Sequence, residues 1–381
     1  MSRDLRIERI EAFAASVPVK SKVTLGIGRT VKRDAVVVKV TTAGGLVGWG
    51  ESHHGRAPGT VGHFINTTLG RLVLGMDASD VVGVSQRIYR AQLASHGLGA
   101  AAAIAMSGID MALWDLRAKA VGWPLYRLLG GAARAIPAYA GGISLGYQPP
   151  ESLAEEARAL VARGYRALKL RLGDSVERDC ARVEAVRAAL GGDIAILTDA
   201  NTGYTVEDVR RVMPVLDGNA VAWLEEPFPA HDHRSYRTAR GFGRTPLAAG
   251  ENHFTRFEFS RLIEDAVLAI LQPDLSKTGG ITEALRIAAM ASAVKLPIHP
   301  HTSATGLNMA ASIHFLCAID NGGYFEADVA VENLFRDELT ARCDALDAAG
   351  CVWPSDAPGL GLEVDEAWLR AHPVIDGPAY V

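Results

Sequence analysis

The chain has 381 residues, 49% of them hydrophobic, which is enough for a barrel of about 200 residues or more together with a smaller domain. Its net charge is −4, and no block of basic residues could follow a phosphate backbone, so we expect no nucleic-acid partner. No run approaches the roughly 18 apolar residues of a membrane span, and the N-terminus lacks an apolar signal segment. We therefore expect a cytoplasmic protein with no membrane contact.

Residues 1–130 are predicted to form an α+β domain. The segments 5–18 and 35–52 alternate and turn as antiparallel strands do, whereas 103–124 carries apolar residues at helical spacing. This pattern differs from the regular strand-plus-helix repeat of residues 131–330. The four cysteines include no CxxC pair, so we expect free thiols and no disulfide.

Residues 131–330 repeat a strand-plus-helix unit. Short apolar runs alternate with segments of helical spacing at 152–164, 175–191, 205–218 and 281–295, which carry Ser or Thr near their starts and often end at Gly. With a first strand near residue 138, the pattern gives eight parallel strands and seven helices. We predict a (β/α)7β modified TIM barrel, with residues 331–381 returning to pack on the first domain.

Three carboxylates close successive strands of this predicted barrel. Asp199, Glu225 and Glu251 are 26 residues apart, and each follows a short apolar run. Parallel barrels keep their chemistry at the C-terminal ends of the strands, so these side chains should converge. Any one of them could instead cap the next helix, but three in successive units favour a shared function. Oxygen ligands alone select a hard cation, and we predict one Mg²⁺ per subunit.

Glu226 follows Glu225 directly, so the alternation of a strand points the two side chains to opposite faces. We assign Glu225 to the metal and Glu226 to a supporting or solvated position.

Other strand ends supply further polar residues to the same rim. Asp274 and His301 end adjacent strands, where an Asp-to-His hydrogen bond would orient the imidazole as a general base. The alternatives are that His299 and His301 are structural, or that they form an HxH metal pair. Glu326 ends the last strand of the series.

Two basic residues, Lys169 and Arg171, lie two apart on one strand and therefore face the rim together. Two cations beside a metal imply an anionic small-molecule substrate, with Asn201 as a further candidate contact. The alternative is a pair of solvated basic residues. Arg171 is a poor proton acceptor because its pKa lies above about 12.

Over nearly its whole length, the chain resembles the enolase superfamily, in its mandelate racemase subgroup. The resemblance rests on GWGES, SGIDMALWDLRAKAVGWPLYRLLGG, TDAN, WLEEP, AGEN, QPDLSKTGG and HPHTS. It implies that Asp199, Glu225 and Glu251 bind Mg²⁺, that Asp274 and His301 form the catalytic dyad, and that Glu326 hydrogen-bonds the substrate carboxylate in the enolate. The second lysine of the family's Lys-x-Lys pattern is here replaced by Arg171.

This departure favours a reaction that needs one base. We expect a Mg²⁺-dependent hydro-lyase that converts an acid sugar into a 2-keto-3-deoxy acid, in a homo-oligomer. The alternatives are a racemase or epimerase of a 2-hydroxy or amino acid, and a catalytically silent barrel that acts as a binding or structural protein. The basic loop around residues 17–33 would favour a diacid if it closes over the site, or is simply a solvated surface loop.

Overall fold

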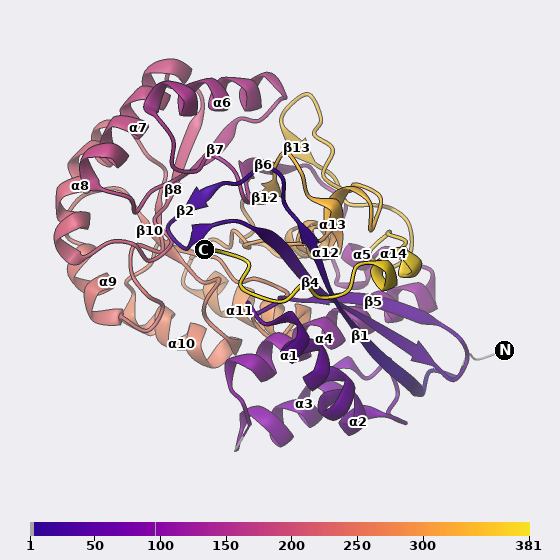
Figure 1. The fold of residues 1–381 in the computed structure, drawn as a ribbon. Helices are drawn as coiled ribbons and strands as arrows, with labels where there is room; N and C mark the ends of the chain where they lie inside the picture. Colours follow the sequence, from indigo (N-terminus) through magenta and orange to yellow (C-terminus); the bar gives the residue numbers. More distant parts are fainter. Residues whose placement is uncertain (1–3, 96) are drawn as a thin grey trace.

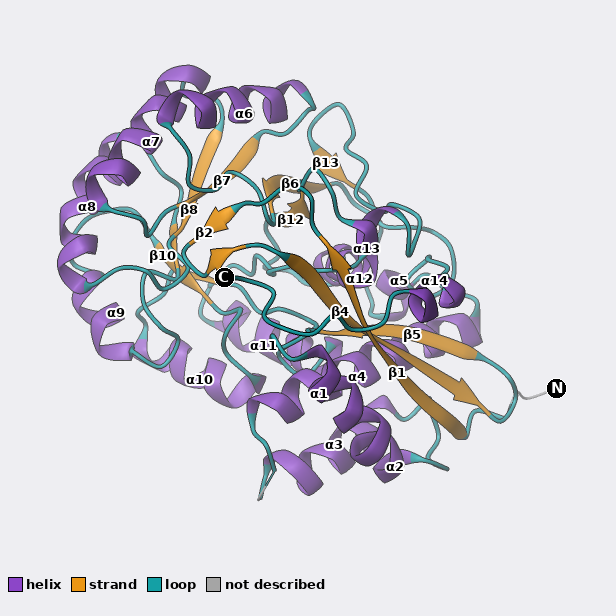
Figure 2. Cartoon of the chain, in the orientation of Figure 1, coloured by secondary structure: helices purple, strands orange, loops and turns teal. Residues whose placement is uncertain are grey.

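A computed structural model describes residues 4–95 and 97–381. It has a barrel whose helices form an outer layer, and a cap that lies against one end of this barrel (Figure 1). Figure 2 shows the short barrel strands inside the layer of helices and the long strands of the cap beside them.

The barrel sheet is parallel, and its neighbouring strands follow the order of the chain. The strands are β6 (Ile136–Gly141), β7 (Ala167–Arg171), β8 (Ala195–Asp199), β9 (Leu224–Glu225), β10 (Leu247–Ala249) and β11 (Ile270–Leu271). β12 (Phe325–Asp328) returns to pair with β6. The position between β11 and β12 is reduced to Ile298, whose bridges to Leu271 and Gly322 close the ring.

Helices alternate with these strand positions on the outside of the barrel. They are α6 (Pro150–Ala162), α7 (Val176–Leu190), α8 (Val206–Gly218), α9 (His233–Ala239), α10 (Thr255–Asp265), α11 (Ile281–Ala293) and α12 (Gly306–Leu316). The predicted (β/α)7β order is thereby confirmed, with its seventh strand shortened to a bridge.

The predicted helix starts are correct at two of the four segments. Ser175 caps α7, and Thr205 forms a capping box with Asp208 at α8. α6 begins earlier, at Pro150, so the expected Ser152 lies inside the helix. α11 is capped from the cap domain, because Asp110 accepts a hydrogen bond from the backbone N–H of Thr282 at 2.9 Å.

The cap is built on an antiparallel sheet of β1 (Ile7–Pro18), β4 (Lys32–Thr42) and β5 (Val47–Ser52). α4 (Ala100–Val121) packs directly on β5. A Cβ added at Gly48 would lie 2.1 Å from the backbone oxygen of Ala112, so only glycine allows this approach. The close packing fixes the end of β5, from which the chain enters the active-site region.

Smaller elements complete the cap. They are the hairpin β2 (Thr24–Leu25) and β3 (Gly28–Arg29), helices α1 (Pro58–Phe64), α2 (Gly70–Val73), α3 (Val81–Ile88) and α5 (Leu125–Leu128), and the π-helical turns η1 (Ile65–Leu69) and η2 (Tyr89–Leu93).

The last segment of the chain contacts both parts of the molecule. It contains α13 (Leu334–Asp337), β13 (Cys351–Val352) and α14 (Glu366–Ala371), and β13 pairs with the barrel strand β6. Further on, Pro373 bridges to Ala15 of β1 and Tyr380 bridges to Thr30. The described tail thus packs on the cap as expected, and also on the barrel. The exact domain limits at 130 and 330 stay predictions.

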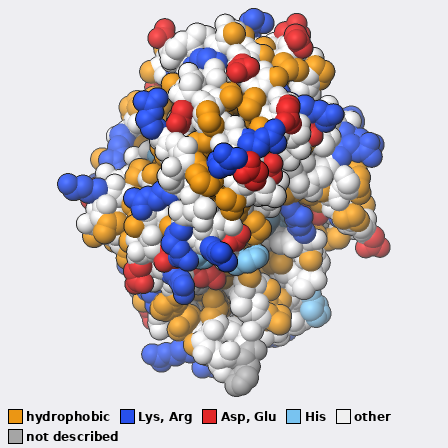
Figure 3. Space-filling view, turned by 90° about the vertical axis from the view of Figure 1, so that its left-hand side faces the viewer, with side chains coloured by type: hydrophobic (Ala, Val, Ile, Leu, Met, Phe, Trp, Pro, Cys, Tyr) orange, Lys and Arg blue, Asp and Glu red, His pale blue; other side chains and the backbone are white. Residues whose placement is uncertain are grey.

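No helix in residues 4–95 and 97–381 is long and apolar enough to cross a membrane. All four cysteines are free thiols, as predicted. On the face formed by the barrel helices, basic side chains are interspersed with acidic and apolar ones (Figure 3).

Candidate active site and metal centre

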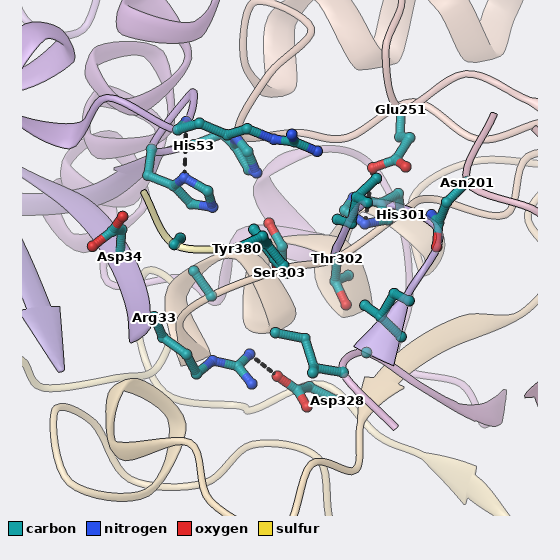
Figure 4. A pocket seen from close by; sticks show the side chains of 18 of the residues that line it. Arg33, Asp34, His53, Asn201, Glu251, His301, Thr302, Ser303, Asp328 and Tyr380 are labelled. Carbon is teal, nitrogen blue, oxygen red and sulfur yellow. Dashed lines mark hydrogen bonds and ion pairs between the residues drawn. The ribbon is translucent and has the colours of Figure 1, made fainter. Parts of the chain in front are cut away.

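A pocket of about 250 Å³ lies where the C-terminal ends of the barrel strands meet the cap. Glu251, Asn201 and His301 line it on one side, and Asp34, Arg33 and His53 line it on the other (Figure 4). Its volume is slightly below the roughly 300–1,000 Å³ of typical small-molecule sites. The pocket therefore suits a small substrate.

Lys169 is buried at the base of the site, between two carboxylates. Its Nζ lies 3.0 Å from Oε1 of Glu225 and 2.9 Å from Oε1 of Glu326. The side chain does not reach the pocket surface, whereas the flanking Leu168 and Leu170 pack in the hydrophobic core. The predicted alternation along β7 is therefore correct.

Arg171 also points into the barrel, and it lines the pocket. Its guanidinium pairs with Asp199 and donates to the backbone oxygen of Gly142. Asn201 lies beside this pair, and its backbone N–H donates to Oδ1 of Asp199 at 2.8 Å. The alternative of two solvated basic residues is thus wrong for both Lys169 and Arg171, which are 1% and 6% exposed.

The predicted dyad is present. Nδ1 of His301 lies 2.7 Å from Oδ2 of Asp274, and its Nε2 lies 3.1 Å from Oε2 of Glu251. Lys277 also contacts Glu251, at 2.8 Å. Burial lowers the pKa of His301, but the charge of Glu251 and the hydrogen bond to Asp274 outweigh it, so the net pKa is raised above its usual value.

Asp274 is held rigidly in this arrangement. Its Oδ1 accepts hydrogen bonds from the backbone N–H and the hydroxyl of Ser276, both at 2.7 Å, and from the amide of Asn308 at 3.0 Å. Its other oxygen is left for His301. Such partners orient the imidazole and determine which nitrogen carries its proton.

His299 is separate from this site. Its Nδ1 accepts a hydrogen bond from the backbone N–H of Tyr324 at 3.0 Å, and its ring packs against Trp223 with a centroid distance of 5.1 Å. Because the chain from Ile298 onward is not a regular strand, residues two apart need not point the same way. The HxH alternative is therefore not supported, and His299 is structural.

Glu226 is the residue that the sequence argument misplaced. β9 ends at Glu225, and Glu226 has a left-handed backbone with φ of 36°, so the alternation of a strand does not extend to it. Its carboxylate lines the pocket with Glu251 and accepts from the amide of Asn252 at 2.8 Å. Glu225 instead accepts from Gln272 inside the barrel, at 2.8 Å.

Left-handed backbone is concentrated around the pocket. The described chain has ten non-glycine residues with positive φ. Five of them line the pocket: Arg56, Asn201, Thr202, Glu226 and Ala304. Strained loop conformations gather at functional sites, where they aim particular side chains.

The donor set of the site suits a hard divalent cation. Six carboxylates lie in this region of the described chain against three basic side chains: Asp199, Glu225, Glu226, Glu251, Asp274 and Glu326 against Lys169, Arg171 and Lys277. Burial, followed by the charge of neighbouring carboxylates, raises the pKa of Glu226 well above its usual range. Excess buried negative charge on oxygen atoms is typical of Mg²⁺ sites.

The three predicted ligands are each in contact with a basic side chain here. Asp199 pairs with Arg171, Glu225 with Lys169, and Glu251 with Lys277. Within residues 4–95 and 97–381, no three His, Cys, Asp or Glu side chains form a ready-made ligand group. The assignment of Asp199, Glu225 and Glu251 to one ion therefore stays a prediction.

The neighbouring cations favour the charged form of Glu326. Burial raises its pKa, but the charges of Lys169, His301 and Arg171 outweigh burial and lower the pKa to about 2. Its oxygens accept from Lys169 and from the backbone N–H of Gly142 and Thr302, at 3.2 and 3.3 Å for the two backbone bonds. A role as hydrogen-bond donor to the substrate would therefore require Glu326 to take up a proton.

The basic loop of the cap contributes less free charge than its composition suggests. Lys32 and Arg33 line the pocket, but Lys32 lies 3.2 Å from Asp34 and Arg33 pairs with Asp328 (Figure 4). Lys20 pairs with Glu332 outside the pocket. Lys22 and Arg29 are exposed and do not line it.

Comparisons with known proteins cover almost the whole chain. Residues 9–130 match the mandelate racemase / muconate lactonizing enzyme N-terminal domain, and residues 152–368 match the enolase C-terminal domain-like family. A solved enolase superfamily member from Polaromonas sp. JS666 is 55% identical, with a TM-score of 0.97 over 99% of this chain and 100% of that chain. A racemase from Streptomyces coelicolor, solved with bound magnesium, is 28% identical, with a TM-score of 0.87 over 97% and 100%.

Two acid sugar dehydratases are among the similar proteins. Arabinonate dehydratase of Saccharolobus solfataricus is 32% identical over 89% of this chain and 90% of its own, and D-galactonate dehydratase of Ralstonia nicotianae is 34% identical over 87% and 88%. A 3,6-anhydro-alpha-L-galactonate cycloisomerase of Streptomyces coelicolor is 30% identical over 94% and 97%. With both of its domains matched, this chain belongs to the enolase superfamily, in the branch that includes mandelate racemase.

Proposed function

We propose that this protein is a Mg²⁺-dependent hydro-lyase acting on an acid sugar, an aldonate or an aldarate. It removes the proton α to the carboxylate and eliminates the β-hydroxyl group as water, and the resulting enol tautomerises to a 2-keto-3-deoxy acid. The observation that carries the proposal is the pairing of His301 with Asp274 at 2.7 Å, on the pocket wall and next to Glu251.

His301 acts as the single base. Its Nδ1 faces Asp274, so Nε2 is the atom that takes the proton, and the electron pair of the broken C–H bond passes into an enediolate. Collapse of the enediolate breaks the C–O bond at the β-carbon. The proton held by His301 then leaves with the hydroxyl group as water, which restores the neutral base.

Asp199, Glu225 and Glu251 would hold the metal, and Glu226 supplies a further oxygen on the pocket wall. A bound divalent cation would stabilise the negative charge that develops on the substrate carboxylate. Lys169 adds a buried positive charge beside Glu225 and Glu326, and Glu326 would contact the carboxylate of the enolate.

Arg171 supports elimination over racemisation. Racemisation needs a second proton carrier on the other face of the substrate, and the guanidinium of Arg171 is tied to Asp199 and to the Gly142 carbonyl. An arginine paired in this way does not give up a proton near neutral pH. The cycloisomerase relative indicates that similar folds support other outcomes, which the assay must separate.

The test is a screen of aldonates and aldarates with Mg²⁺, beginning with arabinonate and D-galactonate. The 2-keto acid product is measured by its semicarbazone absorbance, with His301→Asn assayed in parallel. Reaction in deuterium oxide separates the candidates, because a racemase incorporates deuterium at the α-carbon without forming keto product. Keto acid formation by wild type and by His301→Asn at equal rates would remove the dyad from the mechanism.

A catalytically silent barrel is the remaining alternative. It predicts binding of acid sugars with neither keto product nor deuterium incorporation across the panel. That result would overturn the proposed function.

A further inference from the structure

The cap contributes two adjacent histidines to the pocket, and neither belongs to the dyad. His53 and His54 follow β5, and their rings stack with a centroid distance of 4.1 Å. The backbone N–H of His53 donates to the carbonyl of Ser276 at 2.9 Å. This bond seats the cap loop on the barrel, next to the residue that holds Asp274.

The loop fixes the proton position on both rings. The backbone N–H of Gly55 donates to Nδ1 of His53, and that of Arg56 donates to Nδ1 of His54, each at 3.0 Å. A nitrogen that accepts a hydrogen bond must offer a lone pair, so each neutral ring carries its proton on Nε2. The left-handed backbone of Gly55 and Arg56, with φ of 55° and 58°, maintains these bonds.

Both rings stay neutral. Burial lowers the pKa of His54 to about 3, and the charges of Lys277 and Arg56 act in the same direction. Burial likewise lowers the pKa of His53 well below its usual value. Neither Nε2 makes a hydrogen bond or ion pair within the described chain, so each ring presents one free N–H.

The rest of this wall is polar with little free charge. Lys32 is paired with Asp34 and Arg33 with Asp328. Arg56 also lines the pocket and makes no ion pair within the described chain, but it is exposed, with its guanidinium 5.6 Å from the ring centroid of Tyr380, so water weakens its charge relative to a buried cation. The neutral N–H donors of His53 and His54, beside charges that are already paired, suit hydroxyl groups of the substrate better than a second substrate carboxylate.

We propose that His53 and His54 bind substrate hydroxyl groups through their Nε2–H donors, and that the cap wall selects a monocarboxylate with an uncharged polyhydroxyl chain. The inference rests on the proposed function and narrows it from acid sugars in general to aldonates. The two histidines are binding residues and take no part in proton transfer.

Matched substitutions separate the two nitrogens of each ring. The amide of Asn lies near the position of Nδ1, so His53→Asn keeps an acceptor for Gly55 but loses the donor in the pocket. The longer Gln places its amide near Nε2, so His53→Gln keeps the donor. The corresponding pair at His54 gives an independent repeat of the test.

The assay uses whichever aldonate the screen shows to be turned over. A neutral hydrogen bond made equally in ground and transition states affects KM, so the Asn variants should raise KM about three- to tenfold with kcat within about twofold. The Gln variants should keep KM within about twofold of wild type. Titration calorimetry of the aldonate into His301→Asn, with and without His53→Asn, should show the same loss in binding without turnover.

The second arm compares each aldonate with the aldarate of the same carbon skeleton. We expect kcat/KM to favour the aldonate at least tenfold. A preference for the aldarate that disappears in Arg56→Gln would overturn the neutral-wall inference. Unchanged KM in both Asn variants would overturn the histidine assignment and leave the hydro-lyase intact, whereas a screen with no turned-over acid sugar would overturn the proposed function itself.

Discussion

The barrel and the cap hold their polar side chains in the pocket by different means. On the barrel side, carboxylates and cations are paired at or just beyond strand ends, as in Arg171 with Asp199 and Lys277 with Glu251. On the cap side, His53 and His54 are held by backbone N–H groups of their own loop. The candidate reaction groups thus lie at or beyond the ends of the barrel strands, whereas the cap side of the pocket is formed by a loop held by its own backbone.

The largest expected effect is removal of the metal, which tests the barrel side as a whole. Treatment with a chelator should reduce the dehydration rate to background, and Mg²⁺ should restore it, because the excess of buried carboxylates needs a cation. Mg²⁺ should also raise the melting temperature, since a ligand that binds only the folded state stabilises it. Glu251→Gln should lose this shift. Activity that survives exhaustive chelation would contradict the metal centre.

Substitution of the base should have the next largest effect. His301→Asn should lower kcat by about 10²- to 10⁴-fold, the usual contribution of general acid–base catalysis, with its fold intact by circular dichroism. His231→Asn, at an exposed histidine in the turn before α9, is the control and should retain wild-type kcat. An equal loss in both variants would mean that the assay reports protein quality, not catalysis.

The stability of the protein should depend on the ion pair that connects the cap to the barrel. Asp328→Ala leaves the buried guanidinium of Arg33 without its partner, which should cost about 3–5 kcal/mol of unfolding free energy. The double variant Arg33→Met/Asp328→Leu removes both charges and should recover most of that loss. Urea unfolding measures both. If the double variant is as unstable as the single one, packing and not the unpaired charge explains the loss.

A smaller effect should appear as pH dependence of stability. Burial is the main cause that raises the pKa of Asp110 to about 7, whereas the unfolded chain has the ordinary value of 3.8. The folded state therefore binds the proton more tightly, so the contribution of Asp110 is fully present below about pH 4 and is lost as pH rises through 7.

Asp110→Asn is neutral at every pH and isolates this contribution. The stability of the variant relative to wild type should increase between pH 4.5 and 8, by about 1–3 kcal/mol in urea unfolding. The exposed Asp193→Asn should show no such trend. A difference between Asp110→Asn and wild type that is constant with pH would show that the carboxyl group does not titrate in this range.

Much of the barrel side could be predicted from the sequence. A parallel barrel repeats at nearly constant length and keeps its reactive residues at one end, so the spacing of Asp199, Glu225 and Glu251 was informative. The pairing of Asp274 with His301 followed from adjacent strand positions. These predictions needed only regular elements and the order of the chain.

The other pocket residues could not be placed from the sequence, because their positions depend on irregular backbone that has no repeating pattern. Strand alternation predicts that Glu226 points away from Glu225, but the strand ends one residue before Glu226 and the chain there turns left-handed. Lys277 has no predicted role from the sequence, although it contacts Glu251 on the pocket wall. His53 and His54 carried no signal beyond the dipeptide itself, because their role arises from the turn at Gly55 and Arg56.

Ser276 connects the two regions through one residue. Its N–H and hydroxyl hold Asp274, and its carbonyl accepts the N–H of His53. Departure of the cap loop would release one anchor of the segment that orients the base. Any displacement of this loop would therefore be passed through Ser276 to the carboxylate that orients the base.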